Sequence, residues 1–497
     1  MLEYIKRMLN RTETENGAST LQTTGKECVD LFATIGALRK ASEIEVISRF
    51  ERAFAVNPDI AVKILFYARD IREGLGERRV FRIIMEWLAV MEPEIVKKNI
   101  EYIAEFGRYD DLLILMNTSC EKEMLTYLKN QYEKDCLAMK QGETISLLAK
   151  WLPSVNASNK ETVKNAKKIV KAWGIREVDY RKSVSALRNY IKIIENNLRE
   201  RNYSFDYEKQ PSRALYKYRG AFVRNDGNRY TKFLEEAEKG KAKLKADNIT
   251  PYELVEQYLT AGWYGDYSNS FMRSITADEK RMLNATWKAL PDFGGEENAL
   301  AVIDTSASMY WQHNPMPAAV ALSLGIYFAE RNKGHFRNCF IEFSDKPQLI
   351  EVKGKTFADR LRYAASFNNV ANTSLEAVFD LILQTAVKYK LPQGQLPAKL
   401  IVISDMEFDR CVSDASATNF ENARRKFERR NYQLPEIVFW NVASRNRQQP
   451  VKENEQGVCL VSGVTPRLFS MVAGENLSPY ILMMETISKE RYRKIVA

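Results

Sequence analysis

One carboxylate and two hydroxyls, each separated by a single residue, follow a short apolar run in the second half of the chain. Asp304, Ser306 and Ser308 come directly after residues 299–303, which have the continuous apolar character of a buried parallel strand. In open α/β sheets, ligands bind at the edge where such strands end. Oxygen ligands on one loop suit a hard divalent cation such as Mg²⁺, but three of them are too few. The pattern predicts part of a metal site.

Two later stretches supply further ligands, and each lies at the boundary of a predicted element. Thr373 precedes an apolar helix that starts near Leu375, and Asp405 follows a second apolar strand over 400–403. Asp and Ser also gather in loops simply to satisfy turns. Three pieces in this order, each at a strand end or helix start, favour the metal site over that interpretation. The predicted ligands of Mg²⁺, or of another divalent cation, are Asp304, Ser306, Ser308, Thr373 and Asp405.

Length and composition set wider limits. A chain of 497 residues exceeds what one hydrophobic core usually covers, so we expect two domains or three. No apolar stretch approaches the ~20 residues that span a bilayer, and the first residues lack the apolar core of a signal peptide. The six cysteines form no C-x-x-C pair, so neither a zinc site nor a disulfide framework is indicated. We expect a cytoplasmic protein with no membrane partner.

The positive charge of the chain is concentrated in one region. The net charge is +10, yet residues 156–245 alone carry 23 Lys and Arg against 11 Asp and Glu, so the rest of the chain is slightly acidic. Aromatic residues are interleaved with this charge from Tyr203 to Tyr230. Single-stranded nucleic acid binds to cationic grooves that also offer rings for base stacking. The region is therefore predicted to bind RNA.

The residues expected to contact RNA lie within this basic region. They are Arg181, Lys182, Arg188, Lys209, Arg213, Tyr216, Lys217, Tyr218, Arg219 and Arg224. The alternative is that the tyrosines are half-buried in helix cores while the lysines form a solvated face. That alternative is the better interpretation for any single residue. The concentration of charge favours a nucleic-acid surface for the region as a whole.

Three segments of the chain differ in their pattern. Residues 1–40 are weakly periodic and are predicted to form a partly ordered arm, with an edge helix as the alternative. Over residues 41–292, apolar residues recur at three- and four-residue spacing, which is typical of successive amphipathic helices. Brief polar turns favour an α-solenoid or a ring of helical hairpins, with a plain helical bundle as the alternative. Residues 293–497 alternate strands and helices, which predicts a doubly wound, mainly parallel α/β sheet.

The segment 69–79 places four arginines around a glycine-containing turn. Arginine matches the geometry of phosphate oxygens, so one hypothesis is a contact with an RNA backbone. The other, which we prefer, is intramolecular ion pairing with Asp70, Glu73 and Glu77. The turn itself lacks the third glycine and the Lys-Ser/Thr pair of a phosphate-binding loop.

The order of these parts resembles the Ro autoantigen family. In Ro proteins a ring of HEAT-like helical repeats, the TROVE module, precedes a von Willebrand factor A domain, and the five predicted ligands resemble the metal-ion-dependent adhesion site of such domains. The resemblance to an uncharacterised TROVE-like family is closer still. Besides the metal loop, the segments that carry the resemblance are 65–72, 107–113, 180–182, 211–213 and 404–409.

The resemblance implies a ribonucleoprotein. Ro proteins bind structured noncoding RNA on the basic outer surface of the ring and single-stranded RNA ends in its central hole. The adhesion site implies a free coordination position for a water or for a carboxylate from a protein partner. One departure is that Met406 stands where many adhesion domains have glycine.

Two functions from different classes are compatible with these observations. The first is a Ro-like RNA-binding protein whose von Willebrand A domain holds Mg²⁺. The second is a metal-dependent protein interaction module on a helical scaffold, without nucleic acid. We expect no enzymatic activity, because the two histidines of the chain lie in no recognisable nucleophile motif.

Overall fold

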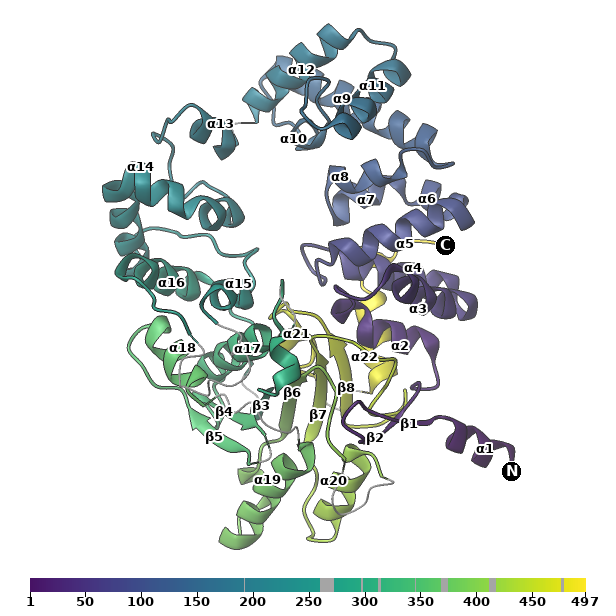
Figure 1. The fold of residues 1–497 in the computed structure, drawn as a ribbon, viewed down its shortest axis with the longest axis vertical. Coiled ribbons are helices and arrows are strands. Elements are labelled where there is room, and N and C mark those ends of the chain that lie inside the picture. Colours follow the sequence, from purple (N-terminus) through teal and green to yellow (C-terminus); the bar gives the residue numbers. More distant parts are fainter. Residues whose placement is uncertain are drawn as a thin grey trace.

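A computed structural model shows a long helical region followed by an α/β region (Figure 1). The residues that the structure describes are 1–191, 193–259, 272–295, 298–311, 314–344, 346–367, 374–410, 417–474 and 478–497. Within them, no helix is long and apolar enough to cross a membrane.

The helical region forms an arc, in which neighbouring helices such as α3 and α4, or α5 and α6, pack side by side (Figure 1). Short 3₁₀ helices are labelled η. The elements are α2 (Glu27–Thr34), η1 (Ile35–Ala37), α3 (Glu43–Val56), α4 (Pro58–Arg69), α5 (Arg78–Met91), α6 (Pro93–Lys98), α7 (Ile100–Phe106), α8 (Tyr109–Leu112), η2 (Leu113–Leu115), α9 (Glu121–Gln141), α10 (Leu148–Trp151), α11 (Lys160–Trp173), α12 (Glu177–Tyr190), α13 (Ile194–Arg199), α14 (Ser212–Glu238), α15 (Pro251–Val255), η3 (Glu256–Tyr258) and α16 (Ala277–Ala289).

Helix α4 shows how the sequence defines these helices. The Asn57 side chain caps the helix by accepting a hydrogen bond from the Ile60 N–H at 3.0 Å, and Pro58 occupies the first turn. The apolar residues Ile64, Leu65 and Ala68, at three- and four-residue spacing, are fully buried. The helix ends before Asp70, where the chain turns. Capping and the burial of most residues over 61–69 therefore agree with these boundaries.

The α/β region contains the predicted mainly parallel sheet, covered by helices on both faces. Its elements are β3 (Ala299–Asp304), η4 (Ala307–Tyr310), α17 (Pro317–Arg331), β4 (Cys339–Phe343), β5 (Gln348–Glu351), α18 (Phe357–Ala365), α19 (Leu375–Tyr389), η5 (Gln393–Gln395), β6 (Lys399–Ser404), α20 (Asn419–Glu428), β7 (Glu436–Asn441), β8 (Val458–Ser462), α21 (Leu468–Met471), α22 (Pro479–Ile487) and η6 (Glu490–Tyr492). Alternate strand residues enter two hydrophobic cores: Ala301 and Ile303 pack with α17, whereas Leu300 and Val302 pack with α19.

The strand order is β5-β4-β3-β6-β7-β8, with only β5 antiparallel. The connection from β3 leads outward to β4 on one side, and the later strands add on the other side, beginning with β6. The order therefore reverses between β3 and β6. In doubly wound sheets, this reversal opens a crevice at the carboxyl ends of the two central strands. The two predicted acidic metal ligands lie at these ends: Asp304 is the last residue of β3, and Asp405 directly follows β6.

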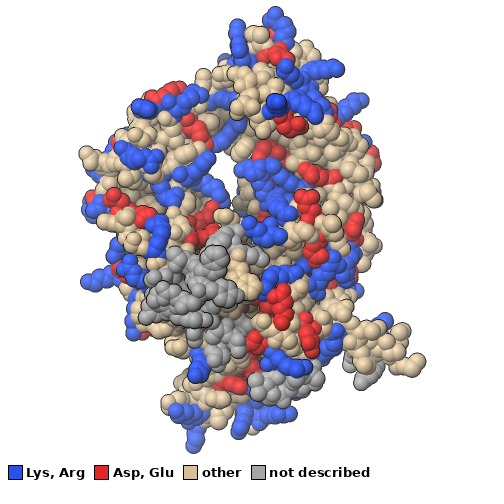
Figure 2. Space-filling view, in the orientation of Figure 1, with Lys and Arg blue, Asp and Glu red and all other residues tan. Residues whose placement is uncertain are grey.

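Both ends of the helical arc pack against the α/β region, so the two regions together close a ring (Figure 1). At one end α2 contacts β8 and α22. At the other end α15 contacts α17 and α16 contacts α18, where the rings of Trp287 and Phe357 stack with centroids 3.7 Å apart. Figure 2 shows an opening in the middle of this ring, with Lys and Arg side chains on both of its sides.

Residues 1–40 differ from the predicted partly ordered arm. After α1 (Leu2–Leu9), β1 (Arg11–Glu13) and β2 (Ser19–Leu21) form an antiparallel hairpin, which we call the N-terminal hairpin. The hairpin lies against the loops that follow β6 and β7, through bridges such as Leu21 to Gln449. Helix α2 is part of the core, with Val29 and Phe32 buried. Two three-residue strands and an eight-residue helix are too short to produce a clear periodic signal.

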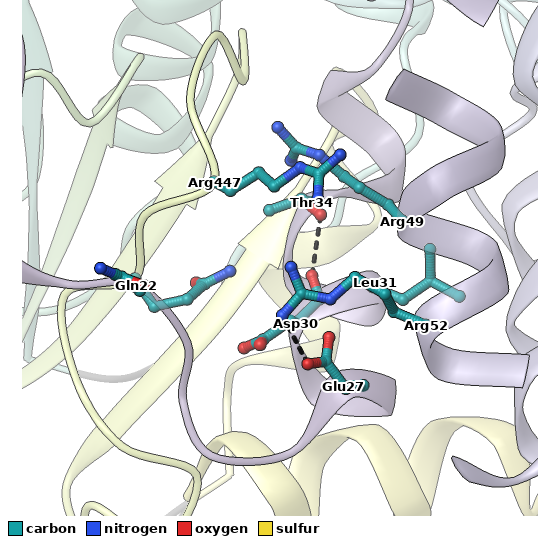
Figure 3. Close-up of a pocket in the computed structure, with 9 residues that line it drawn as sticks. Gln22, Glu27, Asp30, Leu31, Thr34, Arg49, Arg52 and Arg447 are labelled. Atoms are coloured by element: carbon teal, nitrogen blue, oxygen red, sulfur yellow. Dashed lines mark hydrogen bonds and ion pairs between the residues drawn. The ribbon is translucent and has the colours of Figure 1, made fainter. Parts of the chain in front are cut away.

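A small hollow marks the place where the hairpin, α2, α3 and the loop after β7 meet (Figure 3). Arg49, Arg52 and Arg447 reach it from α3 and from that loop, and Arg52 pairs with Glu27 of α2 at 2.5 Å. Its volume is about 20 Å³. That is room for about one water molecule. We interpret the hollow as a polar junction between the two regions rather than as a ligand pocket.

Two of the four arginines of residues 69–79, Arg69 and Arg78, form ion pairs within the protein, but with other acids than the predicted Asp70, Glu73 and Glu77. The Arg79 side chain instead donates to the backbone oxygens of Arg39 and Ala41. Arg69 donates to the buried Asp111 carboxylate at 2.6 and 2.9 Å, and Arg78 pairs with Asp110 at 2.6 Å. Asp70 instead accepts from Arg491 near the C-terminus, at 2.6 Å. The prediction of intramolecular ion pairs is therefore right, but the partners of Arg69 and Arg78 lie on α8 and the partner of Asp70 lies on η6, all distant along the chain.

We expect Asp111→Asn to lower the free energy of unfolding by about 3–5 kcal/mol, because the change leaves the buried Arg69 guanidinium without its counter-charge. Urea denaturation measures this change. The matched control is Glu94→Gln, which removes an exposed partner of Lys97 and should cost less than about 1 kcal/mol. Equal effects of the two substitutions would contradict a central role for the buried pair.

Candidate functional site

The structure brings two predicted acidic ligands to the carboxyl edge of the sheet, at the place where the strand order reverses. Strands β3 and β6 pair in parallel with Ile303 opposite Ile403, so Asp304 lies beside Ser404 and just before Asp405. The Ser404 hydroxyl donates to one Asp304 oxygen at 2.6 Å, and the Ser306 N–H donates to the other at 2.9 Å. Asp304 is therefore held firmly at the end of its strand.

The two predicted serine ligands lie together on the loop after β3. The hydroxyl oxygens of Ser306 and Ser308 are 3.1 Å apart. This spacing lets both oxygens face one cation, because hydroxyl ligands of a single hard ion lie at a similar separation. Thr373, the fifth predicted ligand, lies outside the described residues. The described part of the site thus offers two carboxylates and two hydroxyls.

The electrostatics of the site favour a cation. Burial, together with the nearby charge of Asp405, raises the pKa of Asp304 to about 7. Asp304 and Asp405 are both almost fully buried. A carboxylate in this position is costly unless a positive charge or a proton neutralises it. The donor set and its charge therefore fit a hard divalent cation such as Mg²⁺.

Asp405 already has one cationic neighbour in the protein. Its Oδ1 accepts the N–H of Glu407 at 3.2 Å, and its Oδ2 accepts Nη2 of Arg445 at 2.9 Å. Arg445 lies on the loop after β7. The pattern of the metal motif gave no indication of this arginine, because it stands forty residues further along the chain and belongs to no part of the motif.

Although Met406 replaces the glycine of many adhesion domains, the backbone at this position keeps a conformation typical of glycine. Met406 has φ +68°, which is the left-handed conformation that glycine adopts most easily. Its side chain is buried in the second hydrophobic core, and its N–H donates to the Ser404 hydroxyl at 3.0 Å. Packing of the side chain thus offsets a conformation that costs roughly 1 kcal/mol or more.

A third strand also brings an acid to this edge, which the motif did not predict. Glu342 lies near the end of β4, is buried, and accepts a hydrogen bond from the Thr305 hydroxyl at 2.7 Å. Ser344 donates to its other oxygen at 3.2 Å. A single acid within a short strand such as β4 does not indicate from the sequence that it lies at a functional site. Here Glu342 holds the loop that carries Ser306 in place.

The predicted RNA contacts divide into exposed and internal side chains. The exposed ones are Arg181, Lys182, Lys209, Arg213, Lys217 and Arg224. Arg181 and Lys182 line a hollow of about 600 Å³ beside α12. Lys217 and Arg224 line another, of about 660 Å³, beside α14. These cations are accessible to a ligand.

The other predicted contacts form hydrogen bonds within the protein. Arg188 donates to the backbone oxygens of Ala149 and Leu152 at 2.8 and 2.6 Å, which ties α12 to α10. Arg219 stacks on the ring of Tyr216 at 4.1 Å. The Tyr216 and Tyr218 hydroxyls donate to the Glu253 backbone oxygen and to Glu195, respectively. These four residues stabilise the helical region, so we do not assign them to the RNA surface.

The interleaved aromatic residues also have a mainly structural role. Tyr207, Phe222 and Tyr230 pack against one another, with ring centroids 5.2 to 5.3 Å apart. Phe205 and Phe233 extend the same cluster. These rings form the local core beneath α14. The alternative interpretation of the aromatic residues is therefore correct for this cluster.

One face of α11 carries a basic surface that we did not single out from the sequence. Lys160, Lys164, Lys167 and Lys171 follow one another at helical spacing and are exposed. Together with Lys168 they line a hollow of about 550 Å³. Their spacing of three and four residues was a usable signal for a single charged face.

Comparison with known protein families matches residues 14–139 and 156–292 to the model described as "Domain of unknown function (DUF2828)". These residues make up slightly more than half of the chain. The chain belongs to this family. A second model, "Domain of unknown function (DUF7788)", matches residues 298–480, which contain the sheet and the candidate metal centre.

This DUF2828 chain is similar to two individual proteins as well. It is 28% identical over 522 residues to "Uncharacterized protein L728" of Acanthamoeba polyphaga mimivirus, with 97% of the chain and 88% of that protein covered. A crystal structure of the Deinococcus radiodurans RO (RSR) protein aligns over 93% of both chains, with 11% identity and a TM-score of 0.32.

We expect Asp304→Asn to stabilise the metal-free protein at pH 8, by about 1 kcal/mol or more. The raised pKa of Asp304 means that its ionised form is disfavoured in the folded state, whereas the unfolded chain ionises near pH 4. The cost of folding with a charge is complete above pH 7 and falls as the pH is lowered toward 4. Urea unfolding in EDTA at pH 8 and pH 5 should show a smaller gain at pH 5. A gain of equal size at both pH values would contradict this account.

Proposed function

We propose that this protein binds RNA through the basic surface of its helical region and holds Mg²⁺ at the carboxyl edge of its sheet. In the finer assignment that we favour, the helical arc is a TROVE-like ring of helical repeats, and the α/β region is a von Willebrand A-like domain. The strand order and the Asp304-x-Ser306-x-Ser308 loop support that assignment. Both sites are proposed to bind ligands rather than to catalyse a reaction.

The observation that carries the RNA proposal is the exposed lysine face of α11 next to Arg181 and Lys182 of α12. The two helices are consecutive along the arc and contact each other, and each lines a large open hollow. Lys160 and Lys171 form no ion pair within the described residues. Lys164 and Lys167 have only long, exposed pairs at 4.0 and 3.8 Å. Such cations are free to exchange their counter-ions for phosphates.

The kind of contact follows from the side chains on this surface. Lysine binds phosphate as a point charge, and it lacks the planar guanidinium with which arginine forms paired hydrogen bonds to a base. The aromatic cluster of α14 is buried, so few rings remain for stacking. We therefore propose that the surface contacts the RNA backbone. By the resemblance to Ro proteins, single-stranded ends would enter the opening of the ring, where Figure 2 shows further cations.

We expect Arg181→Glu combined with Lys182→Glu to weaken RNA binding at least about tenfold and to lower the salt dependence of log K by about one to two units. Filter binding of a single-stranded and a hairpin RNA at several salt concentrations measures both effects. The control variant is Lys388→Glu with Lys390→Glu, a matched double reversal near the end of α19. If RNA affinity is unaffected by the α12 reversals, or is equally affected by the control, the surface is wrongly assigned.

We expect Asp304→Ala to abolish Mg²⁺ binding in isothermal titration calorimetry, because it removes one of the two buried carboxylates of the proposed donor set. Asp59→Ala, which removes a half-exposed acid on α4, should leave the Mg²⁺ affinity unchanged. RNA affinity of Asp304→Ala in metal-free buffer should equal that of the wild type. Retention of Mg²⁺ binding by Asp304→Ala would rule out the proposed centre.

A further inference from the structure

Arg445 connects the candidate metal centre to the N-terminal hairpin. Its Nη2 lies 2.9 Å from Oδ2 of Asp405, and its Nη1 lies 2.7 Å from a carboxylate oxygen of Glu15. One guanidinium therefore bridges two carboxylates from segments that are almost four hundred residues apart. Among the described residues, Arg445 is the cation that forms an ion pair with a predicted metal ligand.

Glu15 is held in place by the tip of the hairpin. Its N–H donates to a Glu407 oxygen at 2.8 Å, and its carboxylate also accepts the Asn446 amide at 3.1 Å. Thr14 fixes the tip by donating to the Phe408 backbone oxygen at 2.6 Å. The hairpin thus presents an acid to Arg445 at a defined position beside the sheet edge.

We propose that Arg445 acts as an internal counter-ion that competes with the divalent cation for Asp405, and that Glu15 controls this competition. The inference rests on the proposed metal centre and names the residues that set its affinity. Without metal, the guanidinium neutralises part of the charge of Asp405. With a divalent cation beside Asp304 and Asp405, the same guanidinium experiences strong repulsion at short range.

Glu15 gives the guanidinium a second partner. A planar guanidinium can place two N–H groups on one carboxylate, so Arg445 can leave Asp405 and pair fully with Glu15. The movement needed is small, because Nη1 is already at hydrogen-bond distance from Glu15. Arg445 and Glu15 are therefore positioning residues of the metal centre rather than metal ligands.

This arrangement predicts opposite effects of two substitutions. Arg445→Met removes the competing charge and should lower the Kd for Mg²⁺ at least about tenfold. Glu15→Gln removes the alternative partner, so Arg445 stays on Asp405 and the Kd should rise at least about threefold. In the double variant the Glu15 substitution should have no further effect, because Glu15 acts only through Arg445.

The experiment is a double-mutant cycle in the full-length protein, with Mg²⁺ and Mn²⁺ titrations by calorimetry. Two matched controls carry the same changes at nearby sites. Arg447→Met removes an arginine of the same loop that pairs with Glu45, and Glu13→Gln removes a hairpin acid that lies 3.7 Å from Arg410. Both controls should leave the Kd unchanged.

A second measurement separates this role from a merely structural one. In EDTA, Arg445→Met should lower the urea midpoint, because Asp405 loses its counter-charge. Mg²⁺ should then raise the midpoint of Arg445→Met by more than that of the wild type, because the variant binds the cation more tightly.

The outcomes distinguish the two proposals. If neither the wild type nor Arg445→Met binds a divalent cation, the metal centre itself is wrong and the inference fails with it. If the wild type binds Mg²⁺ but Arg445→Met does not bind it more tightly, the centre stands and the competition is refuted. An additive effect of Glu15→Gln in the double variant would refute the control by Glu15.

Discussion

The pairing of β3 with β6 is the constraint on which the rest of this structure depends. These two strands follow different helices and are separated by about one hundred residues, yet their register places the ends of both at the same level. Because β4 and β7 then extend the sheet in opposite directions, a crevice opens at the carboxyl ends of β3 and β6. A change of register by two residues would separate Asp304 from Ser404 and dismantle the candidate centre. The arrangement of the candidate metal ligands thus depends on the backbone hydrogen bonds between β3 and β6.

The same sheet also holds the ring together. Both ends of the arc pack on the same face of the sheet: α2 contacts β8 and α22, whereas α15 and α16 contact α17 and α18, and all of these elements contribute to one hydrophobic core. The C-terminal residues add a further link, because Arg491 pairs with the buried Asp70 of the helical region. A buried acid that loses such a partner destabilises a fold strongly, whereas exposed pairs contribute little. Closure of the ring therefore depends on a few desolvated contacts rather than on the many surface charges.

Local pattern was enough to predict the sheet, the helical region and the placement of Asp304 and Asp405, since strand ends and helix caps are visible within ten residues of sequence. It failed where function depends on residues that are distant along the chain. Nothing near Arg445 reveals that it faces Asp405, and nothing near Glu15 reveals a neighbour on the far side of the fold. The prediction that tyrosines contact RNA failed for a different reason. A ring that stacks on a base and a ring that packs on another ring have the same sequence pattern.

The positions of the two candidate sites bear on whether they communicate. The lysine face of α11 lies at the far end of the ring from the sheet edge (Figure 1), and ionic screening at physiological salt reduces direct charge interactions beyond about 8 Å. Direct electrostatic coupling between a bound cation and RNA held on this lysine face is therefore negligible. Coupling would require a movement of the ring itself, transmitted through the contacts of α2 and α15 with the sheet region. Those contacts include buried apolar side chains and stacked rings, which resist continuous deformation. The architecture thus favours two sites that act independently on one rigid frame, with the metal centre tuned locally by Arg445 and not by the distant RNA surface.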